Sequence, residues 1–496
     1  MMGEMFTLQL NGTRKFRPLA IFFRKSGKHT LAMLAFPTVL AFFAYTGYRL
    51  YQPLMVASGF TSHYICSEAF ISGREPDKVY ADMVEPEGAI RFIGSLVNYD
   101  VDYDKREATT NIAGLFKTKA VYSEGTGCML VYKPEDVTQG AADSFNSAVG
   151  SSDSLVPEIA GPAVVEPRNE QLRAALDRAF AEREHPPYIR TQAIVVVKDG
   201  KIVAERYAPG IGVDTPLLGW SATKSITNAL IGILVRQGKL DVGQPAPIAA
   251  WQNERDPRHL ITINDLLRQT SGLALTQTSS GFDPASRMVY LERDMAEYAE
   301  GAKLTSKPGT QWAYTDGNFI LLSRIIRDAV GGRASDVRGF AQRELFGPLG
   351  MQHATLEFDA TGTPNGASSM FASARDWARF GLLYLNDGMA GAGRILPEGW
   401  VQYSSSRTLD TGYGAGFWIN LETGGKAPYG LPWGMPHVPH DAFFAMGNMG
   451  QHVVILPSQH LVVVRLGMSH HPDGLIAGAD RLVSDVIAAL QHDSID

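Results

Sequence analysis

Two stretches of the chain combine short apolar runs with turn residues and predict β-hairpins. Residues 193–207, AIVVVKDGKIVAERY, form two apolar runs around Asp199 and Gly200, a dipeptide that is a strong hairpin signal. Residues 450–467, GQHVVILPSQHLVVVRLG, repeat the pattern around a Pro-Ser turn. Because hairpins join antiparallel neighbours, we expect a mainly antiparallel sheet whose strands come from both stretches.

Apolar residues with helical spacing surround these hairpins. Leu172, Leu176 and Phe180 lie four residues apart before the first hairpin, and GADRLVSDVIAALQ, residues 478–491, follows the second. The pattern between the hairpins is mainly helical, without the regular strand-helix alternation that an α/β-hydrolase needs. Residues 168–496 are therefore expected to form one α+β domain, with the sheet flanked by helices.

Two further segments precede this domain. Residues 52–138 contain short alternating stretches such as AIRFIGSLVNY and predict a small strand-containing module. Residues 139–167 are rich in Gly, Ala, Ser and Pro, lack Lys and Arg, and indicate a linker.

The N-terminal residues have the pattern of a membrane anchor. Residues 1–28 are basic, and residues 30–48 carry no charge over a length that just crosses a bilayer. Basic residues before a span keep the N-terminus in the cytoplasm and send the remainder outward. We expect an uncleaved transmembrane helix at 29–51 in the inner membrane, a cytoplasmic segment at 1–28, and the remaining chain on the periplasmic side. A cleaved signal peptide is the alternative.

The chain has two cysteines, Cys66 and Cys128, both beyond the predicted span. In an oxidising compartment two thiols of one small module more often pair than stay free, and two isolated buried thiols are the alternative. No CxxC pair or suitably spaced histidine suggests zinc. The histidines at 437, 440, 470 and 471 lack an HExxH motif or carboxylates at ligand spacing, so we expect no metal site. The net charge of −6 gives no reason to expect nucleic acid as a partner.

A serine and a lysine stand three residues apart at the start of a predicted helix. In GWSATKSITNALIG, residues 219–232, Ser221 and Lys224 share one face of the first helical turn. A neutral lysine amine can take the serine proton and turn the hydroxyl into a nucleophile. Taken alone, however, a serine at this position is more often an ordinary helix cap.

Tyr314 adds a second group of the right chemistry. It lies in KPGTQWAYTDGN, a Pro-Gly-bounded loop directly before a predicted amphipathic helix. A tyrosine hydroxyl near a lysine can relay protons, first from the serine and later to the leaving group. A hydrogen-bonded core tyrosine is the alternative.

Six motifs in a fixed order resemble the serine beta-lactamase-like family. They are WSATKS, ITINDLLRQTSGL, KPGTQWAYTDGN, LFGPLGMQHATLE, SSMFASARDWARFGLLYLNDG and FFAMGNMGQHVVILP. The family includes class C beta-lactamases, D-alanyl-D-alanine carboxypeptidases, related esterases and 6-aminohexanoate-oligomer hydrolases, and the resemblance covers about residues 168–490. It implies that Ser221 is the acylated nucleophile, Lys224 its base and Tyr314 the proton relay, without a cofactor.

Two departures from the family pattern affect the expected substrate. The Tyr-x-Asn motif has an acid, Asp316, at its third position, which cannot donate hydrogen bonds when ionised. The Lys-Thr-Gly motif is absent, and residues 445–447 read Ala-Met-Gly at the nearest place. That lysine helps lactam-binding relatives hold a substrate carboxylate, so its loss favours the esterase and aminohexanoate-hydrolase branches.

The resemblance also suggests where the substrate binds. By motif position, the backbone amides of Ser221 and Asn448 are expected to form the oxyanion hole. Further residues of the cleft loops are candidates for a substrate pocket, with core packing as the alternative: Asp316, Trp433, Met446 and Gly447.

These observations predict a serine hydrolase that cleaves a small-molecule or peptide-like amide or ester, nearest the 6-aminohexanoate-oligomer hydrolases. A cell-wall D,D-peptidase or beta-lactamase keeps the chemistry but changes the substrate. A membrane-anchored, penicillin-binding-like sensor without turnover is an alternative of another class.

Overall fold

The computed structural model describes residues 27–88, 90–136, 154–278, 280–420, 434–470 and 476–492. Its contacts divide the chain into two units, Met1–Tyr51 and Gln52–Asp496. Helix α1, Gly27–Phe70, spans the boundary between them. The second unit contains every strand of the described residues, including both the small sheet and the large sheet expected from the sequence.

The expected membrane anchor is not found. Within the described part of the chain, no helix has both the length and the apolar composition that crossing a membrane requires. The prediction of a transmembrane helix at 29–51, and of an inner-membrane protein with a periplasmic domain, is therefore wrong. The uncharged run instead belongs to α1, a helix of 44 residues that continues past Arg49 to Phe70. Residues 1–26 of the predicted cytoplasmic segment lie outside the described residues.

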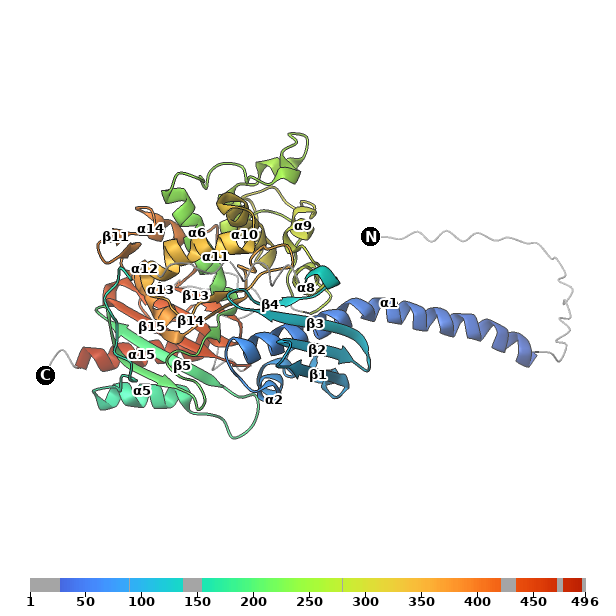
Figure 1. The fold of residues 1–496 in the computed structure, drawn as a ribbon, viewed down its shortest axis with the longest axis horizontal. Helices are drawn as coiled ribbons and strands as arrows, with labels where there is room; N and C mark the ends of the chain where they lie inside the picture. Colours follow the sequence, from blue (N-terminus) through green and yellow to red (C-terminus); the bar gives the residue numbers. More distant parts are fainter. Residues whose placement is uncertain are drawn as a thin grey trace, which may run out of the picture. The chain divides into compact units, whose positions relative to one another are not determined.

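The large sheet confirms the expectation from the hairpins. Six antiparallel strands follow the order β12-β13-β14-β15-β5-β6, so strands from both ends of the domain pair at its centre (Figure 1). Asp199 and Gly200 take positive φ values of 50° and 79° in the turn between β5 and β6, as a tight hairpin turn requires. The strands are β5 Thr191–Lys198, β6 Lys201–Tyr207, β12 Trp418–Ile419, β13 Phe443–Gly447, β14 Gln451–Leu456 and β15 Leu461–Gly467.

Helices cover both faces of this sheet because apolar side chains point to both sides. Along β5, Ile194 and Val196 belong to one buried cluster, while Val195 and Val197 belong to the other. The first cluster is covered by α5, Glu170–Phe180, and α15, Ile476–His492. The second contains the apolar residues of α6 Thr223–Arg236, α10 Asp316–Val330 and α13 Ala374–Leu385.

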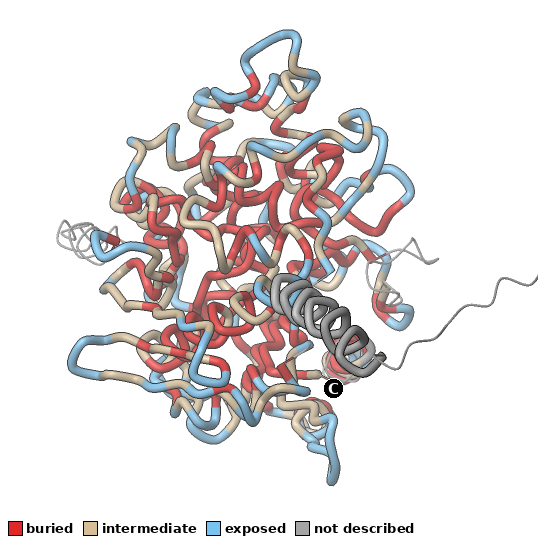
Figure 2. The backbone as a smooth tube through the Cα atoms, turned by 90° about the vertical axis from the view of Figure 1, so that its right-hand side faces the viewer, coloured by how far each residue is buried: buried red, intermediate tan, exposed pale blue. Residues whose placement is uncertain are grey.

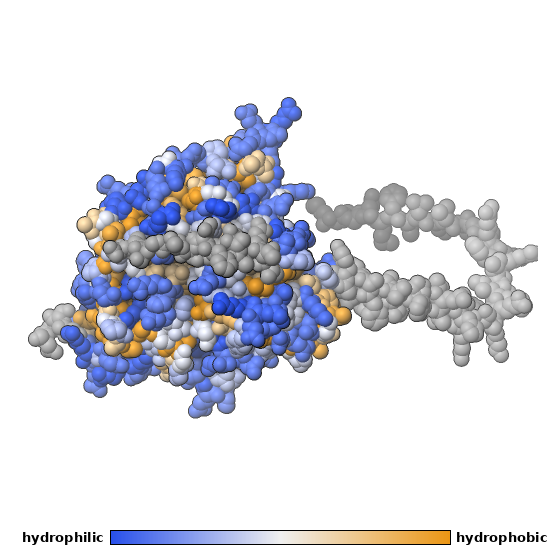
Figure 3. Space-filling view, viewed as in Figure 1, coloured by the Kyte–Doolittle hydropathy of each residue, from blue (hydrophilic) through white to orange (hydrophobic). Residues whose placement is uncertain are grey.

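Buried residues are concentrated in the middle of the fold, and exposed residues in peripheral loops (Figure 2). The face seen in Figure 3 is mostly hydrophilic, with scattered apolar patches.

Shorter elements complete the second unit: α2 Pro76–Val79, α3 Ile90–Ile93, α7 Ile263–Leu267, α8 Pro284–Leu291, α9 Met295–Glu300, α11 Ala334–Ala341, α12 Gly347–Leu349, α14 Trp400–Ser404, β7 Leu217–Leu218, β8 Thr355–Leu356, β9 Met370–Ala372, β10 Met389–Ala390 and β11 Gly393–Arg394.

The strands expected in 52–138 form a separate four-stranded antiparallel sheet. Its order is β1-β2-β3-β4, with bounds Val97–Asp102, Glu107–Ile112, Leu115–Ser123 and Gly127–Leu130. A disulfide joins Cys66 of α1 to Cys128 of β4. The buried cluster around this bond also includes Trp220 and Met449, so the small module shares one core with the large domain.

Glu357 fixes this shared core from the side of the large domain. Its fully buried carboxylate accepts hydrogen bonds from Ser67 Oγ at 2.7 Å and from the backbone amide of Cys128 at 2.7 Å, and contacts His63 Nε2 at 2.8 Å. Buried carboxylates require such partners. The arrangement ties α1 and β4 to the loop that follows β8.

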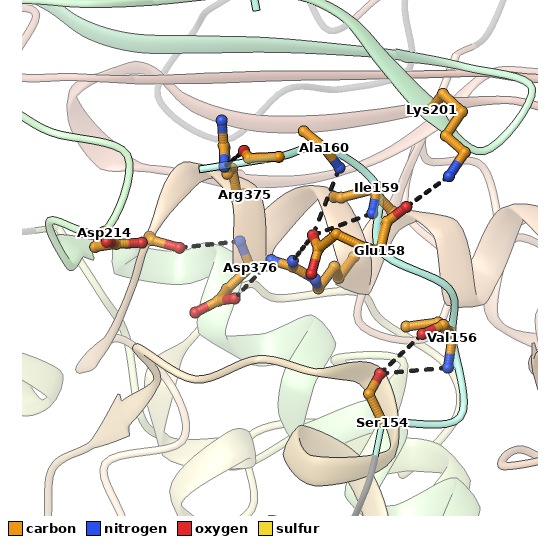
Figure 4. Close-up of polar contacts among 12 residues, drawn as sticks. Ser154, Val156, Glu158, Ile159, Ala160, Lys201, Asp214, Arg375 and Asp376 are labelled. Carbon is orange, nitrogen blue, oxygen red and sulfur yellow. Dashed lines mark hydrogen bonds and ion pairs between the residues drawn. The ribbon is translucent and has the colours of Figure 1, made fainter. Parts of the chain in front are cut away.

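Of the predicted linker, residues 159–165 run along strand β6 at the edge of the large sheet, and Figure 4 shows the start of this segment beside Lys201. Glu158 Oε1 accepts from the backbone amide of Ile159 at 3.2 Å, and Lys201 Nζ donates to the backbone carbonyl of Glu158 at 2.6 Å. The amide of Ile202 donates to the carbonyl of Ile159 at 3.0 Å. This segment therefore pairs with β6, while residues 139–153 lie outside the described residues.

Candidate active site

Ser221 lies in a short 3-10 turn, Trp220–Ala222, between β7 and helix α6. The residue before it, Trp220, has a φ of 47°, a left-handed conformation that costs a bulky residue about 1–3 kcal/mol. Packing offsets this cost, because the Trp220 ring lies 4.8 Å from that of Tyr64. Gly219 allows the turn to approach Trp377, whose ring carbon would stand 2.3 Å from a Cβ at this position.

Lys224 reaches Ser221 from the first turn of α6. Its Nζ lies 3.1 Å from Ser221 Oγ, 2.5 Å from Asp316 Oδ1 and 3.0 Å from the carbonyl oxygen of Ala367. Only 1% of its side chain is exposed. The predicted spacing of three residues thus places both side chains on one face, and a buried acid holds the lysine head in position.

Tyr314 completes the cluster from the loop before α10. It lines the same pocket as Ser221, and its ring centroid lies 4.8 Å from Lys224 Nζ. Burial raises the pKa of Tyr314 well above its usual value, and the charge of Asp316 raises it further. The neutral phenol is therefore the resting form, suited to passing a proton on. Its ring stacks on Trp418 at 5.6 Å.

A buried amide network fixes the loop that carries Tyr314. Gln269 Nε2 donates to the carbonyl oxygen of Thr315 at 2.9 Å, and Gln269 Oε1 accepts from Asn318 Nδ2 at 2.6 Å. Thr315 caps α10 through its side chain, which accepts from the amide of Gly317. Gln269 itself has a φ of 61°, so strained backbone occurs on this side of the site as well.

Asp316 is the first residue of α10, and its backbone amide donates to Gln277 Oε1 at 2.6 Å. Its side chain is 11% exposed and points toward Lys224. The helix N-terminus favours a negative charge at this place. The acid that departs from the family pattern is thus the ion-pair partner of the lysine.

The end of β13 passes directly beside the nucleophile turn. A Cβ on Gly447 would stand 2.2 Å from the carbonyl oxygen of Gly219 and 2.9 Å from Trp220 Cβ, so only glycine fits there. Asn448 follows, and the next residue, Met449, has a φ of 58°. Left-handed residues therefore adjoin both of the predicted oxyanion positions, Ser221 and Asn448.

A pocket of about 410 Å³ opens onto these groups. Ser221, Tyr314 and Asp316 line it together with Met446, Gly447 and Asn448. Of the predicted pocket residues, Asp316, Met446 and Gly447 thus border the cavity, whereas Trp433 lies outside the described residues. Met449 is buried in the core instead. No cluster suited to a metal ion is found in the described ranges.

Comparison with known proteins agrees with this geometry. The family model described as beta-lactamase matches residues 176–486. The chain belongs to the beta-lactamase family. It is a serine hydrolase with the α+β fold of that family, and the predicted family resemblance is confirmed.

Individual members of the beta-lactamase family show the range of relatives. A 6-aminohexanoate-dimer hydrolase from Paenarthrobacter ureafaciens is 25% identical over 305 residues, covering 57% of this chain and 74% of the relative. A D-aminopeptidase from Brucella anthropi is 27% identical over 179 residues, covering 34% of this chain and 32% of the relative. A solved penicillin-binding protein homologue from Caulobacter crescentus shares the fold, with a TM-score of 0.51, 16% identity, and coverage of 66% and 99%.

Several residues at this beta-lactamase-family site were not indicated by the sequence. Gln269 and Gln277 hold the Tyr314 loop, and Glu87 and His452 line the pocket. Gln277 and Glu87 belong to none of the six motifs. Gln269 lies in ITINDLLRQTSGL and His452 in FFAMGNMGQHVVILP, but neither motif indicated a role for these side chains.

Proposed function

We propose that this chain hydrolyses an amide or ester bond through an acyl-Ser221 intermediate, as in the 6-aminohexanoate-oligomer hydrolase and esterase branch of the family. The observation that carries the proposal is the buried contact of 3.1 Å between Lys224 Nζ and Ser221 Oγ, at the wall of a pocket that Tyr314 also lines. A serine with two proton-carrying groups nearby at a pocket wall is equipped for nucleophilic attack.

The proton route begins with Lys224. An ammonium group has three hydrogens, and Nζ faces three oxygens, those of Ser221, Asp316 and Ala367. Lys224 acts as a base in its neutral amine form, whose lone pair can accept a proton, and Nζ already lies 3.1 Å from the Ser221 hydroxyl oxygen. The amine then takes the Ser221 hydroxyl proton as Oγ attacks the carbonyl carbon.

Tyr314 and the backbone complete the reaction. The proton passes through the Tyr314 hydroxyl to the nitrogen or oxygen of the leaving group as the tetrahedral intermediate collapses. The backbone amides of Ser221 and Asn448 stabilise the oxyanion of that intermediate. Water, deprotonated by the same groups, then attacks the acyl carbon and releases the acid and free Ser221.

The third motif favours this branch over lactam recognition. Ala445 is buried in β13 at the place where lactam-binding relatives have the lysine that holds a carboxylate. A methyl group cannot form that ion pair. We therefore expect poor turnover of penicillins and cephalosporins relative to simple amides and esters.

A fluorophosphonate activity probe tests the nucleophile directly. We expect the protein to be labelled in a single tryptic peptide containing Ser221, and the Ser221→Ala variant to lose the label. Ser225→Ala, in the next tryptic peptide along the chain, serves as the matched control and should keep the label, because Ser225 Oγ donates to the carbonyl of Gly416 instead. Labelling that survives Ser221→Ala would contradict the assignment.

A further inference from the structure

The pocket at Ser221 has a wall that comes from the N-terminal module. Pro53, Val56, Ala57 and Phe60 of α1 border the same cavity as the nucleophile. Phe60 also packs against Trp220, with ring centroids 6.2 Å apart, and Trp220 is the residue next to Ser221. The module is therefore part of the substrate site as well as part of the shared core.

The same cavity is also bordered by an acid. Glu87 lines the cavity, and its Oε1 accepts a hydrogen bond from Asn448 Nδ2 at 3.3 Å. Its side chain is 24% exposed, and His470 Nδ1 lies 3.8 Å away. Burial lowers the pKa of His470, so this histidine is neutral near pH 7 and supplies no counter-charge. Glu87 lies beside the predicted oxyanion residue Asn448.

The charges around the cavity are unbalanced. Its described lining residues include two carboxylates, Glu87 and Asp316, and no lysine or arginine. Asp316 is paired with Lys224, which leaves Glu87 as the acid facing the pocket without a cation. Burial raises the pKa of Glu87, and the hydrogen bond from Asn448 offsets this only in part. A cation entering the pocket would relieve the cost of burying this carboxylate.

A second acceptor lies in the same wall. His452 is 1% exposed, and its Nδ1 lies 3.1 Å from the carbonyl oxygen of Gly450, which can only accept a hydrogen bond. Nδ1 therefore carries the proton, and Nε2, for which the described residues provide no partner, is an acceptor. Burial lowers the pKa of His452 to about 3, so the ring stays neutral. His452 therefore adds no positive charge to the lining of the pocket.

We propose that Glu87 binds the ammonium group of the substrate, and that residues 53–60 of α1 contact an apolar chain between that group and the scissile bond. This inference rests on the acyl-Ser221 function proposed above and names its substrate class, a linear amide or ester with a primary amine. A substrate carboxylate in the same place would be repelled by Glu87.

Three 4-nitroanilides of equal chain length test the inference: 6-aminohexanoyl, hexanoyl and adipoyl. We expect kcat/KM to be at least tenfold higher for the ammonium compound than for the methyl compound, and lowest for the carboxylate, because only the ammonium group gains a charge-assisted hydrogen bond to Glu87. In Glu87→Gln the ratio of the ammonium to the methyl compound should fall about tenfold. Glu85→Gln, an exposed acid two residues away, should leave the ratio unchanged.

A second arm tests the apolar wall. Ala57→Phe is expected to lower the ratio of hexanoyl to acetyl 4-nitrophenyl ester turnover, because the added ring occupies the cavity beside Ala57. An unchanged ratio in a variant that still reacts with the fluorophosphonate probe would contradict the role of α1.

The outcomes separate this inference from the proposed function. If no nitroanilide is turned over, binding can be compared instead. The fluorophosphonate probe is allowed to label Ser221 in the presence of 6-aminohexanamide or of hexanamide, and the degree of protection from labelling is measured for each compound. Stronger protection by the ammonium compound, lost in Glu87→Gln, supports the inference. Equal rates or equal protection overturn it while the labelled nucleophile stands, whereas absence of labelling at Ser221 overturns the proposed function itself.

Discussion

Replacing Lys224 with alanine is expected to lower kcat/KM by roughly 10⁴-fold, at the upper end of what general acid–base catalysis contributes. This factor corresponds to about 5.5 kcal/mol of lost transition-state stabilisation. The reason is geometric, because Lys224 Nζ lies 3.1 Å from Ser221 Oγ and alanine leaves no amine at that position to take the hydroxyl proton. Steady-state hydrolysis of a 4-nitrophenyl ester measures the loss.

The control for this variant is Lys239→Ala, which removes an exposed lysine just beyond the end of α6 and should leave the rate unchanged. Circular dichroism at the assay temperature checks folding, since the variant leaves the Asp316 carboxylate without its cation. A folded Lys224→Ala protein with the rate of the unmodified protein would show that the lysine is only a helix residue.

Removing the Cys66–Cys128 bond is expected to lower the free energy of unfolding by about 4 kcal/mol. The bond closes a loop with a sequence separation of 62 residues, and the chain-entropy relation gives this value for a loop of that size. The variant is Cys66→Ser with Cys128→Ser, measured by urea denaturation. Burial of both sulfur atoms in the core that contains Trp220 adds to the loss.

Reducing agent provides the matched comparison. It should lower the urea midpoint of the unmodified protein toward that of the double variant and leave the double variant unchanged. An unmodified protein whose midpoint is the same before and after complete reduction would contradict the predicted contribution.

Local patterns in the sequence predicted the parts of the site that depend on short-range geometry. Ser221 and Lys224 meet because three residues make almost one helical turn, and Asp199 with Gly200 fixes a hairpin through left-handed backbone. Tyr314 was found because it lies in a Pro-Gly-bounded loop directly before an amphipathic helix.

The remaining residues depend on tertiary packing that no local pattern encodes. Glu87 and Gln277 reach the site from segments far from Ser221 in sequence. The interpretation of residues 29–51 as an anchor was wrong for another reason. The absence of charge was taken as the sign of a span, whereas the run belongs to a helix of 44 residues, and no helix of the described residues is both long and apolar enough to cross a membrane.

The central claim is that the reaction passes through a covalent ester on Ser221. Rapid quenching during turnover of a slow amide substrate, followed by tryptic digestion and mass spectrometry, measures that ester directly. The account predicts that the peptide containing Ser221 gains the mass of the substrate acyl group and that Ser221→Ala shows no adduct. Turnover without an acyl adduct at any time point, or an adduct on another residue, would contradict it.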